Sequence, residues 1–216
     1  MAAFIYISMI YGLITRQDIS TENGGSFLAA LAAHTPNAIV FSAFCSKMRL
    51  SKLPSGMYAR SAKHLQRSVS HDEISGMMAA SQIFNTSHRF EIWKHLMSHF
   101  GAYPAIVINK TDYLPFNPAN YYAWGQYANS KLSYLFLPFY IINLILSSNK
   151  SPSETSSKLI YNLELTTLPK NMVNKALFRY FEKKMKAQYG DKYLLAMRKI
   201  YFNQETPDFP LFKVLE

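Results

Sequence analysis

Residues 60–84, RSAKHLQRSVSHDEISGMMAASQIF, contain the clearest helix start in the chain. Ser70 is followed three residues later by Glu73, which is the spacing of a capping box that satisfies free backbone N–H groups of the first turn. Val69 and Ile74 have the spacing of a hydrophobic staple. Apolar side chains then recur at helical spacing along the segment. The pattern predicts a helix that begins at Ser70.

Three ionisable side chains, His71, Asp72 and Glu73, lie together at this helix start. Carboxylates in the first turn are stabilised by the positive end of the helix dipole, so a structural role explains both acids. The same residues also suit acid–base chemistry, because cations of the preceding loop, Arg60 among them, can meet them at one place. The structural interpretation is favoured, since carboxylates at helix starts are common and catalytic ones are rare.

The composition is that of a folded protein with a strong positive charge. The chain has 216 residues, of which 49% are hydrophobic and 17% charged. These values exclude a disordered chain and predict one domain over residues 1–216. A net charge of +10 favours an anionic neighbour, such as nucleic acid, an acidic glycan or a partner protein.

The sequence contains no motif for a cofactor or a metal. No P-loop, GxGxxG, GxSxG or zinc-finger spacing occurs, and Cys45 is the only cysteine. His95 and His99 are four residues apart, as metal ligands on a helix are, but no Glu follows His95 as the HExxH pattern requires. We therefore expect no cofactor and no metal, with the histidine pair facing solvent.

Two apolar runs bear on localisation. Residues 1–15 lack the basic start of a signal peptide, and residues 132–146 are interrupted by Pro138 and Asn143. Both runs are shorter than the about 20 residues that a spanning helix needs. The sequence predicts no signal peptide and no transmembrane span, and with a single cysteine it fits a reducing cytoplasm or a virion.

The fold class predicted from periodicity is mostly α, a multi-helix array around a central buried helix at residues 132–146 that is kinked near Pro138. Residues 103–118 are expected to form a loop with a brief strand, and residues 147–157 a polar linker. Residues 204–216 are expected to form an extended tail. Helices are also predicted at residues 26–34, 36–48, 87–100, 171–189 and 191–203, and a further helix is predicted to start at residues 117–118. Thr35 is the expected N-cap of the helix at residues 36–48.

Two further segments are candidate functional sites. Residues 21–25, TENGG, are either an ordinary turn or a site loop that presents Glu22 and Asn23. Residues 170–199 hold nine Lys or Arg against two acids. That segment is a solvated basic face, a contact with phosphates, or a contact with other subunits. In the last case an oligomer would form through residues 171–216.

The TENGG loop, the arginine of YARS at residues 58–61 and the helix start VSHDEISGM at residues 69–77 resemble a loose group of uncharacterised bacteriophage proteins. The helix-rich layout is similar to the (α/α) toroids of some sugar-active enzymes. The resemblance lies within residues 1–85 and matches Glu22, Asn23, Gly24, Arg60, Ser70, His71, Asp72 and Glu73.

This resemblance implies a toroid-like arrangement and a glycan-active hydrolase or lyase in a phage host. Its catalytic carboxylates would be Asp72, Glu73 and Glu22, and its substrate would be held by Asn23, Arg60 and His71. Two other functions remain open: a non-catalytic phage virion or assembly protein, and a basic protein that binds nucleic acid. The expected partners are thus an anionic polymer, either glycan or nucleic acid, or other phage proteins.

Overall fold

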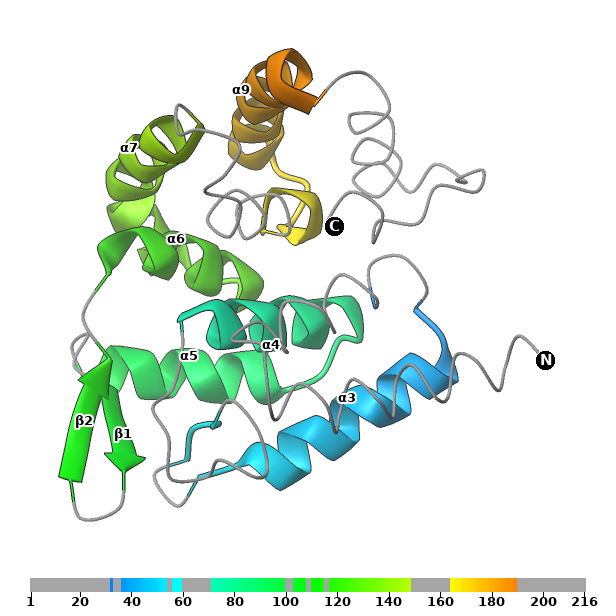
Figure 1. Ribbon diagram of the computed structural model, residues 1–216, viewed down its shortest axis with the longest axis vertical. Coiled ribbons are helices and arrows are strands. Elements are labelled where there is room, and N and C mark those ends of the chain that lie inside the picture. The colour runs from blue at the N-terminus through cyan, green and yellow to red at the C-terminus, as the bar shows by residue number, and fades with distance from the viewer. Residues whose placement is uncertain are drawn as a thin grey trace. The chain divides into compact units, whose positions relative to one another are not determined.

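The computed structural model describes residue 32 and residues 36–53, 56–59, 71–99, 103–107, 110–114, 117–148 and 164–189, with the backbone alone for the strands and for Asp72, Met185, Gln188 and Tyr189. This part of the chain is mostly helical (Figure 1), which confirms the predicted fold class. By its contacts the chain divides into two compact units, Met1–Asn117 and Pro118–Glu216. The single domain and the toroid-like arrangement stay predictions.

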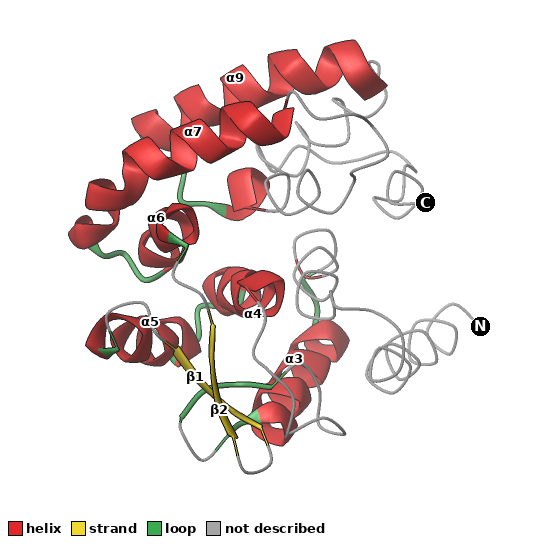
Figure 2. Ribbon diagram, turned by 60° about the vertical axis from the view of Figure 1, so that its left-hand side comes forward, coloured by secondary structure: helices red, strands yellow, loops and turns green. Residues whose placement is uncertain are grey.

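The described part of the first unit contains α3 (Ala38–Ser51), α4 (His71–Ile83) and α5 (His88–Ser98). Helix α4 confirms the helix predicted after residue 70, and it lies beside α5 (Figures 1 and 2). Helix α3 starts two residues later than predicted, because the Oδ1 atom of Asn37 accepts hydrogen bonds from the N–H groups of Ile39 and Val40, at 3.0 Å each. Asparagine is one of the strongest N-caps.

The core of this unit is formed by apolar side chains on the facing sides of the three helices. The fully or almost fully buried ones include Phe44, Met48, Met77, Met78, Ile92 and Leu96. The buried Arg89 guanidinium closes the α4–α5 connection, because it donates hydrogen bonds to the carbonyl oxygens of Ser81 and Thr86 at 2.8 and 3.0 Å. These bonds replace the water that the charge loses on burial.

Two strands follow α5, where the sequence predicts a loop with one brief strand. β1 (Tyr103–Val107) and β2 (Lys110–Leu114) pair antiparallel, with Val107 opposite Lys110. Two residues separate the strands in the sequence, which is the commonest spacing in β-hairpins.

The described part of the second unit contains α6 (Pro118–Tyr127), the 3₁₀ helix η2 (Lys131–Phe136), α7 (Leu137–Ser148) and α9 (Met172–Tyr189). Helix α6 confirms the helix start predicted at residues 117–118, and its aromatic side chains Tyr121, Tyr122, Trp124 and Tyr127 are buried. The aromatic group at residues 121–127 is therefore part of the core. Helix α9 confirms the helix predicted at residues 171–189.

A buried hydrogen-bond network joins three elements of this unit. The Tyr122 hydroxyl on α6 donates to Oδ1 of Asn174 on α9 at 2.6 Å. The Asn174 amide donates to Oε1 of Gln126 at 3.0 Å, and the Gln126 amide donates to the Ser133 hydroxyl on η2 at 2.8 Å. Buried polar groups that are satisfied in this way fix one arrangement of the helices that carry them.

Residues 132–146 do not form the central buried helix that the sequence predicts. The segment is a 3₁₀ helix up to Phe136 and an α-helix from Leu137, so Pro138 lies in the first turn, where its missing N–H costs nothing. Only one face is buried, through Tyr140 and Leu144 among others. Ser147 and Ser148, the first two residues of the predicted linker, belong to α7. The rest of that linker, residues 149–157, and the predicted tail at residues 204–216 lie outside the described residues.

Candidate functional site

The structure describes the side chains of two of the predicted site residues. His71 is half-buried at the first position of α4, and Glu73 is buried two residues further on. The two are on the same helix turn, as the sequence predicts. The side chains of the other predicted site residues lie outside the described part of the chain, and their roles stay predictions: Glu22, Asn23, Arg60 and Asp72.

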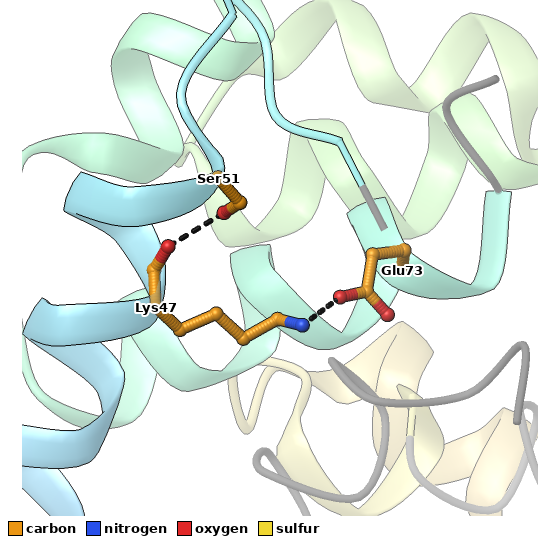
Figure 3. Close-up of polar contacts among 3 residues, drawn as sticks. All are labelled: Lys47, Ser51 and Glu73. Carbon is orange, nitrogen blue, oxygen red and sulfur yellow. Dashed lines mark hydrogen bonds and ion pairs between the residues drawn. The ribbon is translucent and has the colours of Figure 1, made fainter. Parts of the chain in front are cut away.

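Glu73 forms an ion pair with Lys47 of α3 (Figure 3). The Glu73 side chain is 1% exposed and the Lys47 side chain 12% exposed, so the pair is largely out of water. The Lys47 backbone is held as well, because the Ser51 hydroxyl donates to its carbonyl oxygen at 2.6 Å. A buried carboxylate that is paired with an ammonium joins α3 to α4 and is poorly placed to take a proton from a substrate.

A second group of ionisable side chains, missed by the sequence reasoning, lies where α5 meets the segment after α3. The Tyr58 ring is 6.3 Å from the His88 ring, and the Lys52 ammonium is 3.9 Å from the Glu91 carboxylate. Burial, together with the negative charge of Glu91, raises the pKa of Tyr58 to about 12. Burial lowers the pKa of His88. The negative charge of Glu91 opposes this shift, and the positive charge of Lys52 adds to it.

At neutral pH this group therefore holds a protonated Tyr58 and a neutral His88. Neither the Tyr58 hydroxyl nor Nδ1 of His88 has a hydrogen-bond partner within the described ranges. The Phe44 ring packs edge-on against the His88 ring at 5.8 Å. With aromatic rings as close neighbours, the group belongs to the edge of the core.

His95 and His99 do not both face solvent as the sequence predicts. Their rings stack at 4.1 Å between centroids, and both side chains are half-buried. Burial, and then the nearby His99, lower the pKa of His95. Among the described residues no three His, Cys, Asp or Glu side chains lie close enough to hold a metal ion, and two imidazoles alone do not complete a zinc site.

Helix α9 presents a row of cations. Lys175, Arg179, Lys183 and Lys186 are spaced three or four residues apart, which places them along one face of the helix, and all four are exposed. The one acid of α9, Glu182, is buried. We call these four cations the basic face of α9.

Helix α7 presents an apolar face that is exposed. Its buried side includes the polar residues Ser147 and Ser148. Its exposed side is aliphatic or aromatic, and the end of η2 extends it: Leu135 (70% exposed), Phe139 (48%), Ile142 (55%), Ile145 (38%) and Leu146 (56%). We call these five residues the apolar face of α7. The helix packs beside α9 (Figure 2).

Comparison of the chain with protein-family models, with curated proteins and with solved structures finds no match. The bacteriophage resemblance therefore stays a prediction.

Proposed function

We propose that the protein is a non-catalytic docking protein, whose second unit attaches to an anionic partner through the basic face of α9. The observation that carries this proposal is the charge of that helix: its exposed charged side chains are all cations, while Glu182 is buried. The net charge of +10 over the whole chain acts in the same direction.

Neighbouring cations of this row repel one another. Lys175 and Lys186 are eleven residues apart, or about 16 Å along an α-helix. Neighbouring cations in the row are one helical turn apart, well inside the Debye length of about 8 Å at physiological salt. An anionic partner would relieve this repulsion and release its own counterions.

The buried pair of Glu73 with Lys47 disfavours the glycan-enzyme alternative for that carboxylate. Asp72 and Glu22 stay predicted catalytic residues without support from the described geometry. The virion and nucleic-acid alternatives both agree with a basic contact face, so they fall within the docking proposal.

Charge reversal on α9 tests the proposal. Arg179→Glu/Lys183→Glu removes two cations from the basic face, and Arg49→Glu/Lys94→Glu reverses two exposed cations of the first unit. Each reversal changes the charge by two units, so both double variants fall from +10 to +6. We expect the α9 variant to elute from immobilised heparin, a polyanion, at much lower salt than the control variant, which should elute close to the parent protein.

Equal losses in the two variants would contradict the proposal, because retention would then depend on net charge and not on α9. Circular dichroism of both variants must match the parent protein. The four substituted side chains are exposed, and exposed substitutions usually change stability by less than about 0.5 kcal/mol.

A further inference from the structure

We infer that the anionic partner is a lipid membrane, with the apolar face of α7 inserted at the bilayer interface and the basic face of α9 beside it at the headgroups. This inference rests on the proposed function. It is carried by a different observation, the exposure of an aliphatic helix face next to a basic helix.

The exposed side of α7 is apolar, unlike the exposed side of a surface helix of a globular protein. Such a helix turns its apolar stripe to the core and its polar residues to water. In α7 the serines Ser147 and Ser148 are buried and the aliphatic side chains Ile142 and Leu146 are more than half exposed. The helix carries no charged residue, and its polar Asn143 is only half-exposed.

The neighbouring charges favour a lipid surface over other apolar partners. An interfacial helix binds anionic membranes by inserted apolar area together with nearby Lys and Arg, and α7 with α9 supplies both in one unit. A second copy of the chain on the same face would bring two molecules of charge +10 together. Nucleic acid would use the cations but would leave the aliphatic side chains in water.

The geometry favours a helix that lies in the membrane plane. Residues Lys131–Ser148 have the length and composition of a candidate membrane span. With η2 the segment is about 30 Å long, close to the hydrocarbon thickness of a bilayer. A spanning position, however, would draw the packed neighbour α9 and its cations into the bilayer.

Vesicle binding by the full chain tests the inference. The probes are vesicles of phosphatidylcholine with phosphatidylglycerol, and vesicles of phosphatidylcholine alone. We expect the parent protein to co-sediment with the anionic vesicles. Arg179→Glu/Lys183→Glu should weaken this partition by roughly 30-fold or more, because each cation at an anionic surface is worth about fivefold.

A neutral substitution on α7 isolates the apolar contribution. Ile142→Gln/Leu146→Gln leaves the charge unchanged and should lower the partition roughly a hundredfold, about tenfold for each side chain kept out of lipid. Its matched control is Ile39→Gln/Leu50→Gln, two exposed aliphatic residues of α3 in the first unit. The control should bind vesicles as the parent protein does, and both should keep the parent circular dichroism.

The outcomes separate the two proposals. If the α7 pair leaves vesicle binding unchanged, or if the parent protein binds heparin or double-stranded DNA but no vesicles, the membrane inference is wrong and the docking proposal stands. A dimer in light scattering that the α7 pair dissociates would assign the face to a second copy instead. If the α7 pair does not fold, Leu135→Gln, at the most exposed of the five positions of the apolar face of α7, takes its place. Unchanged binding by that variant overturns the inference.

Discussion

The Lys47 ammonium on α3 and the Glu73 carboxylate near the start of α4 form an ion pair inside the first unit (Figure 3). Removing a charge of this size from water costs several kcal/mol, and the attraction of its partner offsets that cost. Each residue is therefore tolerated in the core because the other is present.

The first prediction is that Glu73→Gln strongly destabilises the protein. The amide leaves the Lys47 ammonium without its counter-charge, and breaking a buried pair in this way costs about 3–5 kcal/mol. The free energy of unfolding from urea denaturation, followed by circular dichroism, measures the loss.

The control is the double variant Lys47→Met/Glu73→Gln, which removes both charges. We expect it to recover most of the lost stability, because no buried charge is left without a partner. A loss below about 1 kcal/mol in the single variant would instead match the capping box, in which Gln replaces Glu with little cost. That result would assign the role of Glu73 to its own helix start.

The sequence predicts the helix at Glu73 but not the partner of Glu73. The capping-box spacing of Ser70 and Glu73 is local, and it is enough to place the start of α4. Lys47 is 26 residues earlier, and no local pattern distinguishes it from the other cations around it. The pair exists because α3 and α4 pack together, which only the tertiary structure shows.

The second prediction concerns Asn174, at the centre of the network in the second unit. Asn174→Ala removes the acceptor of the Tyr122 hydroxyl and a donor to Gln126 and to the Pro169 carbonyl. Leaving such buried groups without these bonds should cost at least about 2 kcal/mol in the free energy of unfolding. Asn120→Ala on α6, at a half-buried position, is the control and should change stability little.

The third prediction concerns Gly56, which adopts a φ of +93°. Gly56→Ala should lower the free energy of unfolding by about 1 kcal/mol or more, because residues with a Cβ are strained at positive φ. The added Cβ would lie 3.5 Å from Nδ1 of His95, an ordinary contact, so the loss comes from the backbone. Gly56→Asn should lower the free energy of unfolding by less, since Asn tolerates positive φ. An equal or larger decrease for the Asn variant would point to crowding against His95 instead of backbone strain.

The burial of α7 shows a different limit of sequence reasoning. The apolar run at residues 132–146 correctly predicts a helical segment. A run that is apolar on every side carries no information on which side faces the core. The prediction of a central helix assumed that all sides would be covered, whereas Ile142 and Leu146 are exposed.

The last prediction is a loss of stability on acidification that depends on His95. Burial, and then His99, hold the pKa of His95 below its ordinary value of 6.5 in the folded protein. As the pH falls below that ordinary value the unfolded chain takes up a proton that the folded protein resists, so the free energy of unfolding decreases. The decrease ends once the pH has passed below the pKa of the folded state.

His88 acts in the same direction, because burial lowers its pKa despite Glu91. Urea denaturation at about pH 7 and at about pH 5.5 brackets the upper part of this window. We expect His95→Gln to lose less stability between the two pH values than the parent protein does, and His88→Gln/His95→Gln to lose less again. An identical loss in all three proteins would mean that other groups cause the acid sensitivity, and it would contradict the depressed pKa of both histidines.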